Sequence, residues 1–243
     1  MRYAIFSDVH GNLEAFEAVL KSARSERIDA YLCAGDIVGY GANPNECVEL
    51  VRSVAAVTVA GNHDYASVGL SAGQDMNPEA QAAVDWTRQH LLESSRAYLS
   101  ALPLVRETQE LTIVHGSLDD PQDFHYLVNV FNCAATFDLL QTSLCFIGHT
   151  HVPVIFIEDP VTGDFHYMDV PEAVLDPRKK YIVNVGSVGQ PRDSIVHAAY
   201  CIFDSETRRI SIKRVSYEVF RARQKIVDAG LPRFLGDRLL TGN

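Results

Sequence analysis

The first part of the chain alternates between short apolar runs and amphipathic stretches. The apolar runs at 2–6, 29–36 and 55–64 have the length and continuity of buried strands. The stretches at 12–26 and 43–54 carry apolar residues at helical spacing, which places them on one face of a helix. This β-α-β-α-β order predicts a largely parallel sheet covered by helices.

Later apolar runs continue this pattern and then change it. Residues 111–117, 144–151 and 181–189 are again predicted buried strands, each ending in Gly, His, Asn or Ser. Residues 154–170 and 198–217 each contain two β-like runs around a polar turn, which predicts two antiparallel hairpins. The pattern as a whole indicates an α/β fold with two sheets, one of them mixed.

Two helical segments stand outside this alternation. A helical insert is expected at about 75–102, with Asn77 as the N-cap of its first helix and Ser94 or Ser95 as the cap of a shorter second helix. The last stretch, about 218–243, has the pattern of a basic amphipathic helix followed by a tail broken by Gly and Pro. We expect this C-terminal helical tail to be solvated.

Composition narrows the class of protein. The chain is 47% hydrophobic and 21% charged, as ordinary soluble globular proteins are, and we expect residues 1–243 to form a single domain. No apolar run approaches the roughly 20 residues of a membrane span, and acidic and polar residues appear too early for a signal peptide. The five scattered cysteines favour reduced core thiols in a cytoplasm. The net charge of −10 argues modestly against a nucleic-acid partner.

Polar side chains with metal-binding chemistry follow five of the predicted strands. They are Asp8, His10, Asp36, Asn62, His63, Asp64, His115, His149 and His151. In open α/β sheets, ligand sites form at the carboxyl ends of strands. Residues two apart in extended backbone point to the same side. Asp8 with His10, and His149 with His151, would therefore each approach a ligand as a pair, like a pincer. Any one of these segments alone is commoner as a structural turn or a core histidine, but together they favour a metal site.

The order of these segments resembles the calcineurin-like metallophosphoesterase superfamily. Its pattern of D-x-H, GD, GNH[DE], HG and GHxH stands here as DVH, GD, GNHD, HG and GHTH, between Asp8 and His151. The resemblance implies a four-layer αββα sandwich of two mixed β-sheets around a two-metal site. It also implies hydrolysis of a phosphate ester by direct attack of a metal-bridging hydroxide.

The resemblance assigns a role to each of these side chains. The implied ligands are Asp8, His10 and His151 for one ion, and Asn62, His115 and His149 for the other. Asp36 would bridge both ions, and His63 would be the catalytic histidine and not a ligand, protonating the leaving oxygen. Asp64 would either orient His63 or cap the local turn. Mixed imidazole, carboxylate and amide ligands suit two divalent ions, Mn²⁺ first and then Fe, Co²⁺, Ni²⁺ or Zn²⁺, better than Ca²⁺.

The second block departs from the protein-phosphatase branch of the family. That branch carries GDxVDRG, whereas this chain reads GDIVGYG and lacks the arginine and the second aspartate. The chain is more similar to the small prokaryotic phosphodiesterase-type branch. Arg192, in a loop resembling that branch's NPGS-type loop, is a candidate phosphate ligand, and Tyr40 and Asn43 are candidates for the pocket lining. His125, Tyr126 and the helical insert are candidates for a substrate lid.

The leading hypothesis is a metal-dependent phosphoesterase acting on a small phosphodiester or nucleotide-type ester. The alternatives among enzymes are a phosphomonoesterase, a dinucleoside polyphosphate hydrolase, a nuclease and a protein phosphatase. A non-catalytic metal-binding scaffold of the same fold is an alternative of another class, but the chain keeps His63 and all seven ligand positions. A metal-dependent nucleotide sensor is a third hypothesis. The partner expected is a small phosphate ester, with nucleic acid disfavoured and no membrane.

Overall fold

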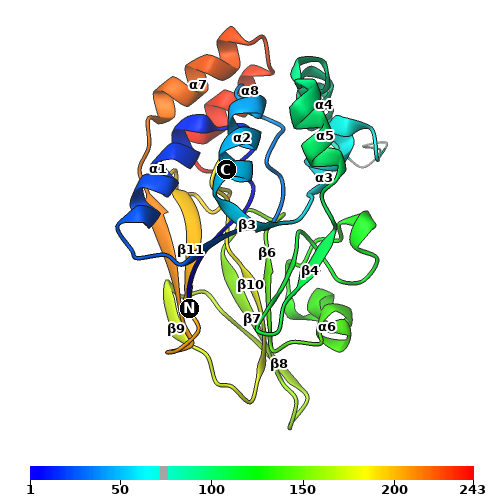
Figure 1. The fold of residues 1–243 in the computed structure, drawn as a ribbon, viewed down its shortest axis with the longest axis vertical. Helices are drawn as coiled ribbons and strands as arrows, with labels where there is room; N and C mark the ends of the chain where they lie inside the picture. Colours follow the sequence, from blue (N-terminus) through cyan, green and yellow to red (C-terminus); the bar gives the residue numbers. More distant parts are fainter. Residues whose placement is uncertain (72–75) are drawn as a thin grey trace.

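Two mixed sheets, each of six strands, pack face to face in the computed structural model, which describes residues 1–71 and 76–243 (Figure 1). Their inner faces share one apolar cluster, because both sheets turn alternate side chains inward. Its buried members include Ile5, Leu32, Ile113, Phe146, Val183 and Phe203. Burying each such side chain contributes about 1.5–3 kcal/mol, so this layer is the main core between the sheets.

The first sheet combines the opening of the chain with its C-terminal hairpin. Its order is β3 (Ala55–Thr58), β2 (Ala30–Cys33), β1 (Arg2–Phe6), β11 (Ala198–Asp204), β12 (Arg209–Val215) and β9 (Glu172–Val174). β1, β2 and β3 are parallel, as the opening pattern predicts. The remaining pairs are antiparallel, and Ile5 of β1 lies opposite Cys201 of β11.

The second sheet holds the middle of the chain. Its order is β4 (Val105–Glu107), β5 (Thr112–Val114), β6 (Leu144–Ile147), β10 (Lys180–Asn184), β7 (Val154–Asp159) and β8 (Asp164–Met168). β5, β6 and β10 are parallel to one another. β7 and β8 form one predicted hairpin, whose turn holds Gly163 at φ 74°, and β11 with β12 forms the other.

Helices cover the outer faces of both sheets (Figure 1). α1 (Leu13–Arg24) and α2 (Pro44–Val54) pack on the first sheet through a cluster that includes Phe6, Phe16 and Val48. α6 (Val130–Leu139) packs on the second sheet around Phe137. The layers therefore follow the order helix, sheet, sheet, helix, which confirms the four-layer αββα sandwich of two mixed sheets.

The first helix of the insert begins as predicted. α4 (Pro78–His90) follows Asn77, whose side-chain oxygen accepts a hydrogen bond from the Ala80 amide at 2.8 Å. Asn77 is therefore the N-cap, because it satisfies one of the free amides of the first turn. The expected start of the insert, near residue 75, lies outside the described residues.

The second helix of the insert begins earlier than predicted. α5 (Glu93–Ser100) has Leu92 as its N-cap, so the assignment of the cap to Ser94 or Ser95 is wrong. The amide of Leu92 donates to the side-chain oxygen of Asn45 at 2.9 Å. This contact with α2 fixes the chain at Leu92, so the helix begins before the serines are reached.

A short helix replaces the end of the predicted third strand. β3 ends at Thr58, and α3 (Asn62–Val68) begins inside the GNHD segment, which was expected to be extended. Gly61 is the N-cap, and the Asp64 carboxylate accepts the Gly61 amide at 3.0 Å. This bond is the half of a capping box in which the N3 side chain accepts the N-cap amide, and it favours a helix start over an extended strand end.

The C-terminal tail packs against the body, so the expectation of a solvated tail is wrong. The tail comprises α7 (Val219–Asp228), α8 (Arg233–Asp237) and the 3₁₀ turn η2 (Arg238–Leu240). Ile226, Leu235 and Leu239 are buried with Tyr40 and Ala80 in one cluster. The buried Glu14 carboxylate pairs with Lys225 of α7 at 2.6 Å, so both apolar and charged contacts hold the tail.

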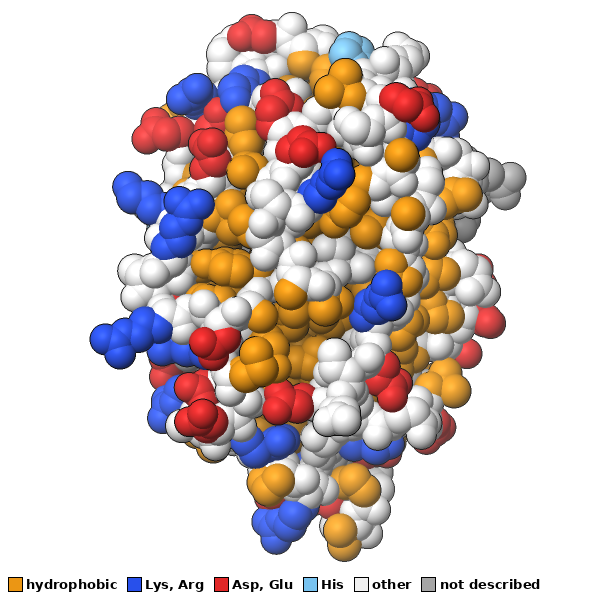
Figure 2. Space-filling model, viewed as in Figure 1, with side chains coloured by type: hydrophobic (Ala, Val, Ile, Leu, Met, Phe, Trp, Pro, Cys, Tyr) orange, Lys and Arg blue, Asp and Glu red, His pale blue; other side chains and the backbone are white. Residues whose placement is uncertain are grey.

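The surface and the cysteines agree with the composition. All five cysteines are buried and free. Acidic and basic side chains are interspersed on the face shown in Figure 2. Within residues 1–71 and 76–243, no helix has both the length and the apolar character needed to cross a membrane.

Candidate metal centre and cleft

Side chains that follow β1, β2, β5 and β6 meet at one end of the two sheets. Asp8 and Asp36 come from the first sheet, whereas His115 and His149 come from the second. The His149 amide donates to the Asp8 carboxylate at 3.1 Å. The Gly148 amide donates to the His115 carbonyl at 3.0 Å. The predicted gathering of these residues at strand ends is therefore present, and it joins the two sheets.

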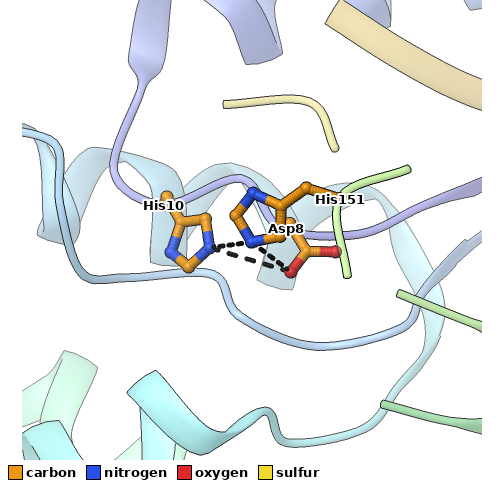
Figure 3. Close-up of side chains that lie close together, drawn as sticks. All are labelled: Asp8, His10 and His151. Atoms are coloured by element: carbon orange, nitrogen blue, oxygen red, sulfur yellow. Dashed lines mark hydrogen bonds and ion pairs between the residues drawn. The ribbon is translucent and has the colours of Figure 1, made fainter. Parts of the chain in front are cut away.

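Asp8, His10 and His151 form the first cluster of ligand atoms. His151 Nε2 lies 3.2 Å from Asp8 Oδ1 and 3.1 Å from His10 Nε2. Figure 3 shows both imidazoles turned toward the Asp8 carboxylate. All three side chains are buried, so three potential donors converge on one small space.

Asp36, His115 and His149 form the second cluster. Asp36 Oδ2 lies 3.3 Å from His115 Nε2 and 3.6 Å from His10 Nε2, so this carboxylate borders both clusters. The buried atoms His115 Nε2, His149 Nε2 and Asn62 Oδ1 have no hydrogen-bond partner among the described residues. A buried polar atom without a partner costs free energy. This donor set is the kind that a divalent transition-metal ion satisfies.

Backbone carbonyls fix the orientation of three imidazoles. The Nδ1 atoms of His10, His115 and His151 lie 3.0, 2.7 and 2.6 Å from the carbonyls of Val38, Ala34 and Gln190, respectively. In a neutral imidazole, donation from Nδ1–H to a carbonyl leaves the Nε2 lone pair free and directed at the cluster. Metal-binding histidines in proteins are held in this manner.

The clustered charges perturb one another strongly. Burial would raise the pKa of both carboxyls, but His151 beside Asp8 and His115 beside Asp36 hold it well below the usual range. Burial lowers the pKa of His149 to about 3. Burial would also lower the pKa of His115, but Asp36 outweighs it and raises the value to about 9. The carboxylates are thus charged and His149 is neutral, the forms that bind a cation, whereas His115 would have to release a proton on binding an ion.

The backbone at the site is left-handed rather than extended. The φ angles are 55° at Asp8, 50° at His10, 69° at His149 and 63° at His151. The extended backbone predicted for DVH and GHTH is therefore wrong. Asp8 and His10 still reach one cluster, through two left-handed residues, whereas His149 and His151 belong to different clusters. Non-glycine residues in the left-handed region cost about 1–3 kcal/mol each and cluster at functional sites. Gly148 permits this approach, since a Cβ there would overlap the Asp8 side chain.

His63 lies at the start of α3, beside the second cluster. Its amide donates to Asp36 Oδ1 at 2.9 Å, and its ring centroid lies 4.4 Å from that of Tyr40. One ligand atom each of His10, Asp36 and His63 also lies within 4.8 Å of the others, so distance alone does not separate His63 from the ligands. Burial lowers the pKa of His63 to about 4.

Asp64 caps the turn instead of orienting His63. Its Oδ1 accepts the amides of Ile37 and Val38 at 2.9 and 3.1 Å, and its Oδ2 accepts the amide of Gly61. The carboxylate therefore ties the loop after β2 to the start of α3. Of the two roles that the sequence left open for Asp64, the structure supports the cap.

A cleft of about 720 Å³ opens beside the second cluster, with Asn62, His63 and His149 in its wall. Tyr40 and Arg192 also line this cleft. Arg192 Nη2 donates to Tyr40 Oη at 3.3 Å and to Gln190 Oε1 at 3.0 Å. Its buried Nε has no partner within the described part of the chain.

Asn43 is not among the residues that line this cleft. Its side-chain oxygen accepts a hydrogen bond from Lys225 Nζ at 2.9 Å, and its amide nitrogen donates to Glu46 at 2.9 Å. Asn43 therefore joins α2 to the C-terminal tail. Sequence reasoning could not separate it from Tyr40, because both follow Asp36 closely in the chain.

Sequence reasoning did not single out Gln190 or Phe124. The Gln190 carbonyl faces His151 Nδ1, and its side chain receives Arg192. Phe124 lines the cleft together with Tyr126 and Met76 of the segment before α4. The only sequence signal was position, since Gln190 lies in the NVGSVGQPRD loop and Phe124 lies between the HG motif and α6.

Comparison with known proteins identifies the family to which the chain belongs. The model of the calcineurin-like phosphoesterase superfamily domain matches residues 1–208. An uncharacterized protein of Methanocaldococcus jannaschii is 40% identical, over 98% of this chain and 97% of that protein. The structure of a metallophosphoesterase from Sphaerobacter thermophilus is 42% identical, with a TM-score of 0.88 over 100% and 99% of the two chains. A symmetrical bis(5′-nucleosyl)-tetraphosphatase of Nitrosococcus oceani is 30% identical over 50% of this chain and 45% of that protein.

Proposed function

We propose, since the chain belongs to the calcineurin-like phosphoesterase superfamily, that it is a binuclear metal-dependent phosphoesterase acting on a phosphodiester or nucleotide-type ester. The observation that carries the proposal is a set of buried metal-ligand atoms that lack hydrogen-bond partners. His149 Nε2 and Asn62 Oδ1 are buried without partners among the residues described, and His115 Nε2 has the charged Asp36 beside it, at 3.3 Å. A site built only for structure would pair these atoms.

The two clusters divide the proposed ligands into two sets. Asp8, His10 and His151 would hold one ion, and Asn62, His115 and His149 the other, with Asp36 between them. Two divalent ions so held would supply Lewis acidity and a water of lowered pKa. The donors are imidazole, carboxylate and amide and include no thiolate, which suits Mn²⁺, Fe, Co²⁺, Ni²⁺ or Zn²⁺, and Mn²⁺ is our first choice among these.

His63 and Arg192 would act on the substrate. His63 faces the cleft and would give a proton or a hydrogen bond to the departing oxygen. Because burial lowers its pKa to about 4, protonation would require the negative charge of the bound phosphate. Arg192, which lines the cleft, would bind a phosphate oxygen. Tyr40 is almost fully buried, so its role would be to hold Arg192 through its hydroxyl.

The similarity to a tetraphosphatase that acts on bis-nucleosyl substrates favours dinucleoside polyphosphate hydrolysis as the second candidate. A protein-phosphatase activity is disfavoured because the arginine of GDxVDRG is absent. A non-catalytic scaffold is disfavoured because His63 lies in the cleft wall. The free buried cysteines fit a reducing compartment, and we propose the cytoplasm.

Metal removal combined with a substrate screen tests the function. We expect chelation to abolish hydrolysis and to lower the melting temperature, and Mn²⁺ to restore both. An ion at one hundred times its Kd adds about 2.7 kcal/mol to the stability of the native state. The screen would compare p-nitrophenyl phosphate, bis(p-nitrophenyl) phosphate, cyclic nucleotides and dinucleoside polyphosphates with Mn²⁺, Co²⁺, Ni²⁺ and Mg²⁺. Full activity after exhaustive chelation, with no metal in elemental analysis, would overturn the proposal.

A further inference from the structure

The segment between the HG motif and α6 folds back over the second cluster of ligand atoms. A Cβ on Gly116 would lie 2.9 Å from the His125 carbonyl oxygen, so this return passes directly over Gly116. Phe124 anchors the segment, since its side chain is buried and its ring centroid lies 6.0 Å from that of His115. The ring of Phe124 also meets Tyr65 of α3 edge to face at 5.8 Å. Two contacts from different elements thus fix the segment before it reaches Tyr126.

Tyr126 presents an aromatic ring at the cleft. Its ring lies 3.9 Å from that of His149, centroid to centroid, with 18° between the planes. One face is therefore covered by a proposed metal ligand. The residue is nevertheless 53% exposed and lines the cleft together with Arg192. The uncovered side of the ring is thus available to a ligand in the cleft.

We propose that Tyr126 is a stacking platform that selects phosphate esters carrying a planar aromatic group, such as a nucleobase. The proposal rests on the proposed function, because the phosphate must sit at the metal cluster for the aromatic group to reach Tyr126. Aromatic side chains stack on nucleobases whatever the base, since every base has a π-face. Tyr40, the other tyrosine of the cleft, is only 6% exposed and offers no such face.

The cleft has room for both parts of such a ligand. Its volume of about 720 Å³ lies within the roughly 300–1,000 Å³ of small-molecule sites. Arg192 supplies positive charge for the phosphate, and Phe124, Met76 and Ala80 add apolar surface to the wall near Tyr126. A phosphate with only a small aliphatic group would leave Tyr126 without a contact. Selectivity among esters that share the same phosphate group should therefore depend on the aromatic group.

The test compares ligands that differ only in the aromatic group. AMP and ribose 5-phosphate share the same 5′-phosphate ester, and AMP adds adenine, while phenyl phosphate places an aryl ring next to phosphorus. Each would be measured as a competitive inhibitor of the Mn²⁺-loaded protein, and by kcat/KM where it is hydrolysed. We expect the wild type to prefer AMP over ribose 5-phosphate by about 10-fold or more. Tyr126→Leu should remove this preference by weakening AMP much more than ribose 5-phosphate, and Tyr126→Phe should keep it.

The comparison with phenyl phosphate shows whether Tyr126 recognises a nucleobase or an aryl group next to phosphorus. A Tyr126→Leu effect on AMP alone assigns the platform to a nucleobase, and an effect on phenyl phosphate alone assigns it to an aryl ester. Equal losses for AMP and ribose 5-phosphate, together with loss of metal, would overturn the proposal and make Tyr126 a positioning residue for His149. Unchanged constants would also overturn it. Failure of the metal-loaded wild type to bind or hydrolyse any phosphate ester would instead overturn the proposed function.

Discussion

The Asp36 carboxylate lies between the two clusters, 3.3 Å from His115 Nε2 and 3.6 Å from His10 Nε2. If it bridges two ions, its loss should weaken both sites, whereas His151 borders only the first cluster. We therefore expect Asp36→Asn to lose both metals during dialysis and His151→Ala to lose mainly one. Elemental analysis of both variants beside the wild type measures this difference. Two tightly bound metals per chain in Asp36→Asn would refute the bridging role.

The effect of replacing His63 distinguishes the catalytic hypothesis from the scaffold hypothesis. We expect His63→Ala to keep both metals and to lose about 10²–10⁴-fold in kcat on an alkyl or ribose ester, the usual contribution of a general acid. The loss should be clearly smaller on a p-nitrophenyl ester, because that leaving group departs without a proton. Both esters would be measured on one metal-loaded preparation.

The comparison of the two esters distinguishes three results for His63. Equal losses on both esters would replace the general-acid role with stabilisation of transition-state charge. That result would agree with the pKa of about 4 that burial gives this imidazole. No loss on either ester would show that His63 is not catalytic.

Residues in short motifs were predictable, and residues that act through contacts between distant segments were not. The Asp and His positions of DVH and GHTH follow from the sequence because each motif lies directly after a buried strand. The way they converge does not follow, since the left-handed φ at Asp8 and His151 depends on how two sheets meet. The assignment of Asn43 to the cleft failed for a similar reason, because its partner Lys225 lies in the distant tail.

At the scale of the element, the two helices of the insert provide a matched pair of caps. Asn77 accepts the Ala80 amide, whereas the exposed Ser94 lies inside α5 and caps nothing. We expect Asn77→Ala to lower the free energy of unfolding by about 1 kcal/mol. Ser94→Ala should change it by less than about 0.5 kcal/mol. Denaturant titration of both variants measures this, and a similar loss in the two would contradict the cap assignment.

Helix starts were predictable only where one side chain decided them. The Asn77-Pro78 pair signals a helix locally, and α4 begins there. The start of α5 depends on Asn45, which belongs to another helix. The start of α3 had a local signal, Gly61 with an acid three residues later, but the apolar run before it favoured a longer strand.

At the scale of the whole molecule, the C-terminal tail is part of the fold. Leu235 is 1% exposed within the cluster that contains Tyr40 and Ala80. We expect Leu235→Ala to lower the free energy of unfolding by about 2–5 kcal/mol, as removal of a buried leucine does. Phe220→Ala is the matched control, because Phe220 is 77% exposed on the same tail. Chemical denaturation followed by circular dichroism measures both, and equal stability of the two variants would mean that the tail is not anchored.

The amphipathic pattern of the tail was visible in the sequence, but its partner was not. An apolar stripe on a helix indicates that something covers it, and basic residues on the other face favoured solvent as the main neighbour. The covering residues, Tyr40 and Ala80, lie far earlier in the chain, and they are brought together only by the α/β body. Glu14 is buried beneath Lys225 for the same reason.

The position of β1 inside the first sheet has a consequence for synthesis. Its hydrogen-bonding partners on one side come from β11. Ile5 therefore has no strand partner on that side until Cys201 has been synthesised. At about 5–20 residues per second, the ribosome needs roughly 10–40 s between the two. Throughout that interval the nascent chain carries β1 with one unpaired edge, the kind of surface that attracts strands from other chains. We infer that a chaperone shielding the first strands would raise the yield of this protein more than one acting after release.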